Sequence, residues 1–203
     1  MRSVTLLLLP VVVAAQGSDT SPARRLPQYT RTLQLNATPD TSANVSVRDL
    51  NGDGTLDLLL VNGRHWGGLS IVMLGDGHGR FPTVYPLGPE RHRSYSGRLV
   101  DLDGDGHLDV VLSNDAPDPK LIFLNDGTGH FRAGGQFGRP AWDTRNAAVA
   151  DLNGDGLPDI VVANRADHNA IAYICLNQGH GRFSADCAGF AHITAMAVRA
   201  TCT

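Results

Sequence analysis

The sequence predicts an all-β protein built from a tandem array of four-stranded units, and three observations support this fold class. One nine-residue acidic motif occurs three times at a nearly constant spacing. Each copy is followed by two short apolar runs and then by a glycine-rich turn that ends in an aromatic residue. Every acidic residue except Glu90 is aspartate, which is typical of turns and metal loops, whereas helical proteins use glutamate freely on exposed faces.

The composition restricts the class of protein further. Of 203 residues, 42% are apolar and 18% charged, with 23 Gly and 11 Pro, as expected for a folded, turn-rich chain rather than a disordered or collagenous one. This length favours one domain and excludes a large multidomain enzyme. The formal net charge of -3 argues against nucleic-acid binding and against attraction to an anionic membrane.

The N-terminal residues predict export. We interpret residues 1–15 as a secretory signal, because Arg2 precedes an apolar run that ends in small residues suited to cleavage. An uncleaved anchor is disfavoured, since the run is interrupted by Pro10 and is much shorter than the ~20 residues that span a bilayer. We expect residues 16–28 to be a short flexible lead-in. We therefore expect a secreted or extracellular protein, periplasmic or on the cell surface if bacterial, with no membrane insertion after signal removal.

The acidic motif divides the rest of the chain into repeats. It reads DLNGDGTLD at 49–57, DLDGDGHLD at 101–109 and DLNGDGLPD at 151–159, so its starts lie 52 and 50 residues apart. In each repeat we expect four short strands, with the acidic loop between the first and the second. The expected units span about 45–87, 97–137 and 147–189.

The same register continues beyond both ends of these units. Tyr29 lies 20 residues before Asp49, at the spacing that separates later aromatic residues from the next acidic loop. Residues 29–35 therefore match the last strand of an earlier unit. Residues 195–200 match the first strand of a later unit and place Ala200 where a fourth aspartate would stand.

The acidic motif has the spacing of a metal loop. In D-x-[D/N]-x-D-G-x-x-D, the side chains at positions 1, 3, 5 and 9 and the carbonyl at position 7 can converge on one ion, while glycine at position 6 permits the sharp turn. Ligands that are all oxygen, in this number, favour Ca²⁺ over Mg²⁺, and we expect about three ions. The predicted ligand sets are Asp49, Asn51, Asp53, Thr55 (carbonyl) and Asp57; Asp101, Asp103, Asp105, His107 (carbonyl) and Asp109; and Asp151, Asn153, Asp155, Leu157 (carbonyl) and Asp159.

Two other calcium motifs are disfavoured by the residues that come after the loop. An EF-hand requires a bidentate glutamate at position 12, but Leu60, Leu112 and Val162 stand there. These residues lie in short apolar runs rich in β-branched residues, which predict strands. A dockerin is disfavoured for the same reason, because its loop leads into a helix.

The segments DLNGDGTLDLLLVN, DLDGDGHLDVVLSN and DLNGDGLPDIVVAN, together with the G-x-G-x-F turns and Phe137-Gly138, resemble the FG-GAP/VCBS repeat of integrin-α-like β-propellers. The resemblance covers roughly residues 29–203. It implies one four-stranded blade per repeat, a calcium ion between strands 1 and 2, and a secreted or surface location. Three repeats are fewer than the 4 to 8 blades of closed propellers. We therefore expect a fragment of a seven-bladed propeller or a partial propeller that closes by self-association.

The function that this pattern favours is non-catalytic. We expect a calcium-binding scaffold for extracellular binding or adhesion, whose ligand is a protein or a glycan. By the family's geometry, the contact residues would lie on the rim opposite the calcium loops, where aromatic residues and Arg are typical anchors. The candidates are Trp66, Arg91, His92, Tyr95, Trp142 and Arg145. The alternative for both tryptophans is packing between blades.

An enzyme or a lectin is the alternative function, since such repeats also occur in calcium-dependent polysaccharide lyases and hydrolases. The acidic clusters are already assigned to metal, however, and the sequence contains no nucleophile elbow, zinc motif or phosphate loop. Cys175 and Cys187 flank a turn and either form a disulfide, which export would permit, or remain buried thiols. Cys202 is then left over.

Overall fold

A computed structural model describes residue 35, residues 40–165 and residues 172–189. Its contacts divide the chain into Met1–Ala37 and Thr38–Thr203, and the fold below is that of the second unit. The expected signal, lead-in and terminal strand fragments lie outside the described residues, apart from Leu35. No helix long and apolar enough to cross a membrane occurs in the described part of the chain.

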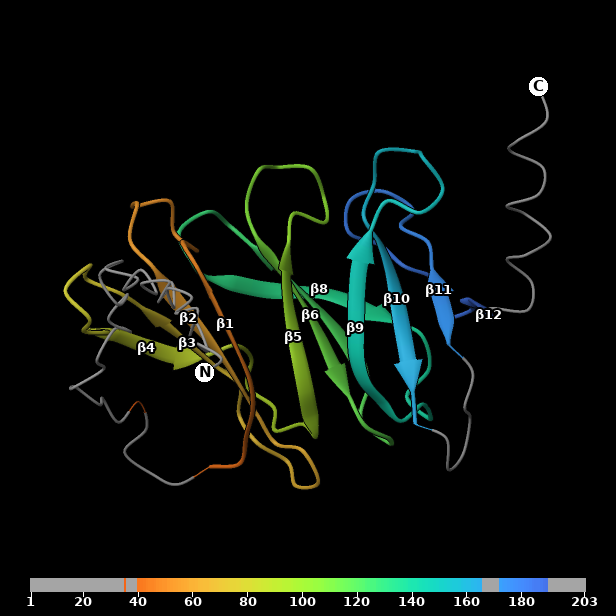
Figure 1. The fold of residues 1–203 in the computed structure, drawn as a ribbon, viewed down its shortest axis with the longest axis horizontal. Coiled ribbons are helices and arrows are strands. Elements are labelled where there is room, and N and C mark those ends of the chain that lie inside the picture. The colour runs from red at the N-terminus through yellow and green to blue at the C-terminus, as the bar shows by residue number, and fades with distance from the viewer. Residues whose placement is uncertain (1–34, 36–39, 166–171, 190–203) are drawn as a thin grey trace, which may run out of the picture. The chain divides into compact units, whose positions relative to one another are not determined.

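The described residues form twelve strands and no helix, in three four-stranded sheets that we call the first, second and third blades (Figure 1). The first blade contains β1 (Ser42–Arg48), β2 (Asp57–Asn62), β3 (Ile71–Leu74) and β4 (Thr83–Pro86). The second contains β5 (Ser94–Val100), β6 (Asp109–Asn114), β7 (Lys120–Asn125) and β8 (Phe131–Phe137). The third contains β9 (Thr144–Ala150), β10 (Asp159–Asn164), β11 (Tyr173–Cys175) and β12 (Ala188–Gly189).

Each blade is an antiparallel meander in which every strand pairs with its neighbour in sequence. This confirms the predicted all-β fold of four-stranded units. The first strand of each blade begins three residues before the expected boundary, and its pairing with the second strand contains a register shift near that end. The extra length places a short polar segment at the end of the blade opposite the acidic loops.

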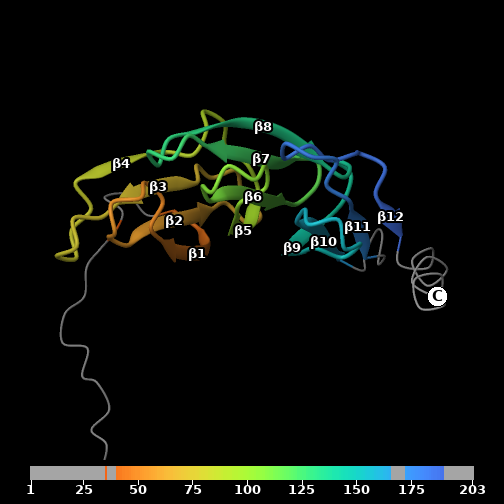
Figure 2. The same ribbon diagram turned by 90° about the horizontal axis from the view of Figure 1, so that it is seen from above.

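The blades pack face to face in sequence order, with the second between the first and the third (Figure 2). Strand β6 is buried at all six positions, which explains why its apolar residues 110–112 are consecutive rather than alternating with polar ones. Between the first two blades the core includes Leu59, Val72 and Phe123. Between the second and third it includes Ile122 and Ile160.

Polar contacts join the first strands of neighbouring blades. Ser46 Oγ donates to the carbonyl oxygen of Gly97 at 3.0 Å, and Arg98 Nε donates to that of Ala147 at 2.7 Å. A Cβ atom on Gly97 would lie 2.9 Å from one side-chain carbon of Leu59 and one of Val61, both in β2, so glycine leaves room for these core side chains. The first strands are therefore fastened to one another by hydrogen bonds as well as by packing.

Candidate metal centres and the opposite rim

Each acidic loop connects the first strand of its blade to the second. The first loop, for example, follows β1 and leads directly into β2 at Asp57. Because strands flank all three loops in the described structure, the EF-hand and dockerin arrangements are excluded, as the sequence predicted.

The first aspartate closes each loop by accepting two backbone hydrogen bonds. Asp49 accepts from the amides of Gly52 at 2.7 Å and Gly54 at 2.8 Å, and Asp101 and Asp151 make the same pair of contacts in their loops. Both glycines have positive φ, 75° and 83° in the first loop. Nothing lies within 4 Å of a Cβ built on either one, so glycine is needed there for backbone conformation and not for space.

In the first and third loops an asparagine at position 3 contacts the aspartate at position 5. Asn51 Nδ2 donates to Asp53 at 2.9 Å, and Asn153 Nδ2 donates to Asp155 at 2.8 Å. Hydrogen bonds from the hydroxyl and amide of Thr55 hold the pKa of Asp53 below its usual range. In these two loops, hydrogen bonds from residues of the same loop therefore stabilise part of the negative charge.

The middle loop is different because Asp103 replaces the asparagine. One oxygen each of Asp101, Asp103 and Asp109 lies within 4.8 Å of the others, and Asp103 Oδ1 is buried with no hydrogen-bond partner among the described residues. Burial raises the pKa of Asp109 to about 6, and the nearby charges of Asp103 and Asp105 raise it further, against two backbone hydrogen bonds that lower it. A buried, unpaired carboxylate oxygen beside two other carboxylates fits a hard cation.

The aspartate at position 9 has a structural role that the sequence did not reveal. Asp109 is fully buried and accepts from the amides of Leu102 at 2.8 Å and Asn125 at 2.9 Å, so it joins its loop to the end of the third strand. Asp57 and Asp159 are fully buried too and make the same two contacts in their blades. A ligand at position 9 would therefore bind metal with oxygens that already order the loop.

The donor set as a whole fits Ca²⁺, since every predicted ligand is an oxygen. In the middle loop the structure brings Asp101, Asp103 and Asp109 together, whereas Asp105 accepts a hydrogen bond from the His107 amide at 2.9 Å. The carbonyl ligands at position 7 and the sites in the first and third loops remain predictions.

Sequence reasoning also missed the role of an asparagine at the start of the glycine-rich turn. We call this residue the asparagine latch. Asn125 Nδ2 donates to the carbonyl oxygens of Leu108, in its own blade, at 3.1 Å and of Leu50, in the preceding blade, at 2.8 Å. Asn177 makes the corresponding pair of bonds in the third blade. The signal was present in the turns NDGTGH and NQGHGR, which begin with asparagine where the first turn, GDGHGR, has Gly75.

Comparison with known families supports this architecture. A family model described as FG-GAP-like repeat matches residues 49–112 and 101–162. The chain belongs to the FG-GAP-like repeat family. The predicted resemblance is thus confirmed, and the matched segments contain all three acidic loops. A comparison with curated proteins finds no significant match.

At the rim opposite the acidic loops, the FG-GAP-like blades present several of the predicted contact residues. Trp66 is 76% exposed. The Arg145 guanidinium, from the third blade, lies 4.7 Å from the centre of the Tyr95 ring of the second blade, and the Tyr95 hydroxyl lies 3.2 Å from His65 Nδ1. Arg91 Nε donates to the carbonyl oxygen of Gly67 at 3.0 Å.

The structure corrects the expectation for Trp142. This side chain is 3% exposed and stacks on Tyr173 with ring centroids 4.2 Å apart, in the core between the second and third FG-GAP-like blades. It is therefore a packing residue, which was the alternative left open. The physical reason is packing, because the ring fills the space beside Tyr173 and beside Gly138, where a Cβ atom would overlap it.

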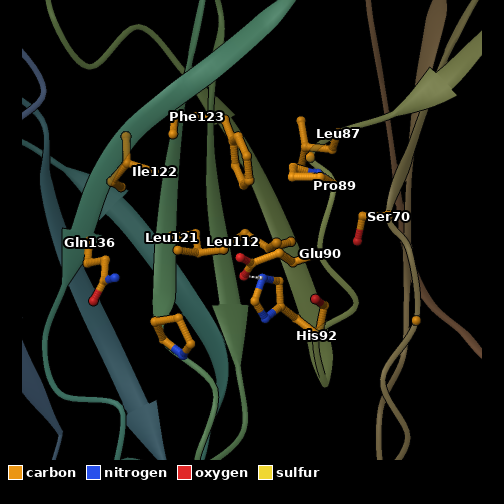
Figure 3. A pocket seen from close by; sticks show the side chains of 15 residues that line it. Ser70, Leu87, Pro89, Glu90, His92, Leu112, Leu121, Ile122, Phe123 and Gln136 are labelled. Carbon is orange, nitrogen blue, oxygen red and sulfur yellow. Dashed lines mark ion pairs between the residues drawn. The ribbon is translucent and has the colours of Figure 1, made fainter.

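His92 is also largely buried and lines a cavity of about 290 Å³ between the first and second blades (Figure 3). Its Nε2 lies 3.5 Å from a carboxylate oxygen of Glu90. Leu87 and Phe123 form an apolar part of the wall, and Gln136 adds a polar group. Of the six candidates, His92 is the one that lines this pocket.

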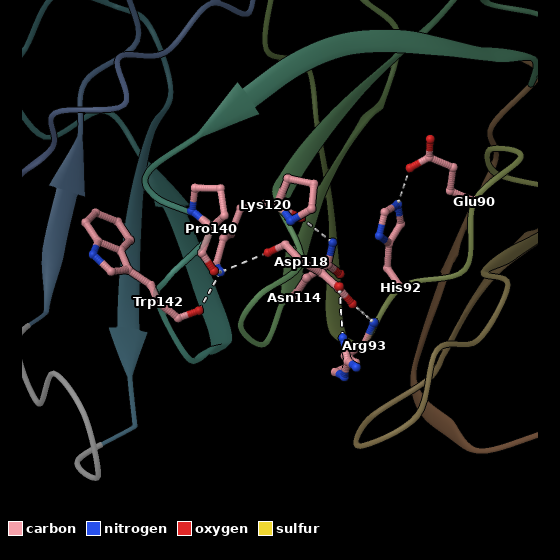
Figure 4. Close-up of polar contacts among 9 residues, drawn as sticks. Glu90, His92, Arg93, Asn114, Asp118, Lys120, Pro140 and Trp142 are labelled. Carbon is pink, nitrogen blue, oxygen red and sulfur yellow. Dashed lines mark hydrogen bonds and ion pairs between the residues drawn. The ribbon is translucent and has the colours of Figure 1, made fainter.

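A fully buried lysine fastens the rim between the second and third blades (Figure 4). Lys120 Nζ donates to the carbonyl oxygens of Asp118 and Pro140, each at 3.1 Å, and also to that of Trp142. Burial lowers the Lys120 pKa to about 8, although nearby aspartates oppose the shift. Arg93 pairs with the Asp118 carboxylate at 3.0 Å, so this rim contains a continuous polar network.

Cys175 and Cys187 form a disulfide between β11 and the segment before β12. Their Cα atoms lie 4.4 Å apart, and Cys175 is fully buried in the core between the second and third blades. The disulfide closes the smallest of the three sheets, whose last strand contains two residues. Cys202 lies outside the described residues.

Proposed function

We propose that this FG-GAP-like protein is a calcium-binding, non-catalytic extracellular scaffold whose rim binds a protein or a glycan. The observation that carries the proposal is the middle loop, where Asp101, Asp103 and Asp109 converge and one oxygen of Asp103 is buried without a hydrogen-bond partner in the described part of the chain. Such a group of carboxylates is costly unless a cation neutralises it.

Calcium would act by stabilising the array of blades. The aspartate at position 9 ties each loop to the third strand of its blade, and the latch next to it ties the second and third blades to the preceding one. An ion in the loop would therefore hold contacts within and between blades. Extracellular modules bind Ca²⁺ with a Kd of ~10⁻⁴ to 10⁻³ M, and at tenfold that concentration each site adds roughly 1.4 kcal/mol of stability.

An extracellular location is supported by two features. The Cys175–Cys187 disulfide suits an oxidising compartment, and the apolar segment in residues 1–15 has the pattern of a secretory signal. For ligand binding, the exposed Trp66 and the stacked pair Tyr95 and Arg145 supply the kind of surface that contacts a protein or the face of a sugar ring.

The calcium part is tested by thermal unfolding in excess EDTA and in excess calcium. We expect a lower Tm in EDTA, recovered by added calcium, because three sites together would contribute roughly 4 kcal/mol. Asp155→Ala should remove one ion from the number measured by calcium titration, whereas Asp186→Ala, an exposed aspartate outside the loops, should remove none. An identical melt with and without calcium would contradict this part.

The ligand part is tested separately on the calcium-loaded protein with an array of glycans and extracellular matrix proteins. We expect at least one reproducible ligand whose binding is lost in Trp66→Ala and in Arg145→Ala, with the Tm of Trp66→Ala unchanged because Trp66 is exposed. Val84→Ala, at an exposed apolar residue of β4, is the matched control. Turnover of a bound polysaccharide would contradict the non-catalytic role and favour the enzyme.

A further inference from the structure

The leucine that follows the first aspartate of each acidic loop differs sharply in exposure between the blades. Leu50 is 3% exposed and Leu102 is 0% exposed, whereas Leu152 is 46% exposed. We call these residues the plug leucines. The loops are otherwise alike, and each plug leucine donates its amide hydrogen to the aspartate at position 9. The difference therefore comes from the neighbouring residues that cover the side chain.

The first two plug leucines are covered by the next blade. Leu50 belongs to the core between the first and second blades, and Leu102 to the core between the second and third. The residues that form each receiving surface, which we call a socket, occupy equivalent positions in the repeat. Each socket residue shares a core cluster with the plug leucine, is the latch asparagine, or accepts a bond from that asparagine: Leu99, Leu108, Val110, Asn125 and Phe131 in the second blade and Val149, Pro158, Ile160, Asn177 and Phe183 in the third.

The glycine-rich turn of the next blade completes these contacts. A Cβ built on Gly129 would lie 3.4 Å from Cβ of Asn51, and one built on Gly181 would lie 3.6 Å from Cβ of Leu102. At the equivalent Gly79 of the first blade, nothing lies within 4 Å. The turn of the first blade is thus not in contact with a loop of this kind.

The first blade has a socket that receives no plug leucine in the described structure. Its five equivalent residues all line one cavity of about 480 Å³, and two of them are clearly exposed, Val47 at 39% and Leu56 at 63%. The five are Val47, Leu56, Leu58, Gly75 and Phe81. Within residues 40–165 and 172–189, one end of the array therefore has an unoccupied socket and the other an exposed plug leucine.

We propose that this chain forms a homodimer in which Leu152 of each copy occupies the first-blade socket of the other. Two observations favour a second copy as the occupant. The same contact already forms twice within the chain, so its geometry is set by the repeat. The described residues supply three blades per copy, so two copies would give six, which lies within the 4 to 8 blades of closed propellers, whereas three copies would give nine. Such a head-to-tail contact closes when its rotation permits.

The free face of the third blade has the apolar surface that this contact needs. Leu176 of that blade is 41% exposed, whereas its equivalent Leu124 in the second blade is 4% exposed. The contact between copies would lack one bond, because Gly75 stands in place of the latch asparagine. It should therefore be weaker than the two contacts inside the chain and depend on protein concentration.

The oligomeric state tests the proposal. In calcium-containing buffer, light scattering after size exclusion should give twice the monomer mass, and dilution should give the monomer. Leu152→Asp and Val47→Asp should each give a monomer at concentrations where the wild type is dimeric, since either one places a charge in the contact. Trp66→Asp, at an exposed apolar residue on the opposite rim, should remain dimeric.

A mixing experiment separates loss of the contact from loss of folding. The Leu152→Asp protein keeps a normal socket, and the Val47→Asp protein keeps a normal plug leucine. When the two monomeric variants are mixed, the plug of the second should therefore occupy the socket of the first, which gives a one-to-one complex with a single contact. Neither variant should associate with itself. The proposal is overturned by a wild type that stays monomeric at every concentration, by particles larger than a dimer, or by variants that do not pair when mixed.

Discussion

Asn125 Nδ2 donates a hydrogen bond of 2.8 Å to the carbonyl oxygen of Leu50, a residue 75 positions earlier and in another blade. Asn177 repeats this bond to Leu102 in the next blade, at 2.9 Å and at the same separation in sequence. Each asparagine also closes its own glycine-rich turn by accepting an amide hydrogen bond. Neighbouring blades are therefore joined by a polar contact beside the first and the second acidic loops.

Removing the asparagine latch should destabilise the protein. In Asn177→Ala, the buried carbonyl oxygen of Leu102 loses its Asn177 hydrogen bond, and the amide of Gly179 loses its acceptor. We expect a loss of about 2–3 kcal/mol in the free energy of unfolding measured in urea. Gln178→Ala, the exposed next residue, should change this free energy by less than about 0.5 kcal/mol. Equal effects of the two substitutions would show that the latch is energetically unimportant.

The middle acidic loop should be the tightest calcium site because it has four carboxylates where the other loops have three. Asp103→Asn should lower its calcium affinity about tenfold, or ~1.4 kcal/mol, and should raise the Tm in EDTA by relieving repulsion. Asn51→Asp is the reciprocal variant, for which we expect a tighter first site and a lower Tm in EDTA. Calcium titration and melting curves of both proteins measure these effects, which must have opposite signs.

Calcium binding at the middle loop should weaken in mild acid. Asp109 has a folded-state pKa of about 6 against an ordinary value of 3.8, so its proton competes with calcium as the pH falls through 6. In the calcium-free protein, the folded state holds this proton more tightly between pH 3.8 and 6, so the contribution of Asp109 to stability decreases as the pH rises through that window. In Asp103→Asn, the midpoint of the affinity change should move to lower pH, because the Asp103 charge is one cause of the shift. An affinity independent of pH from 5 to about 7 would refute this assignment.

Lys120 should make stability rise with pH in the alkaline range. Its pKa is about 8 in the folded protein against an ordinary value of 10.5, so between these values the unfolded chain binds more protons, and this residue's contribution to stability increases with pH. Lys120→Met should remove this contribution and, by leaving the carbonyl oxygens of Asp118, Pro140 and Trp142 without this donor, should cost about 2–4 kcal/mol at pH 7. Urea unfolding of both proteins at several pH values measures the difference. If the two pH profiles are parallel, the Lys120 proton is not linked to folding.

Local sequence was sufficient to predict the strands and the loops, because both depend on short-range chemistry. Apolar runs such as residues 110–113 indicated the second strand, and the spacing of aspartates and glycines indicated a loop whose glycines adopt positive φ. The disulfide between Cys175 and Cys187 was left open against free thiols, since spacing alone does not show whether two cysteines approach.

Residues that act between blades could not be predicted in the same way. Trp142 was a candidate for ligand contact, yet it lies in the core, because the fold of a rim loop decides whether its aromatic side chain points inward. Asn125 looked like an ordinary turn residue, and its bond to Leu50 exists only because two blades stack. Lys120 was not identified at all, since burial of a cation depends on three carbonyl groups supplied by different segments.

The sequence by itself therefore determined the repeat, the four-stranded unit and the acidic loops, since each is encoded within about 50 residues. Only the tertiary structure decided whether residues at the same position of the repeat lie in the same environment. Leu50, Leu102 and Leu152 have the same place in the motif, but two are buried and one is exposed. The physical reason is that burial depends on the neighbouring blade, and a repeat motif contains no information about whether that neighbour is present.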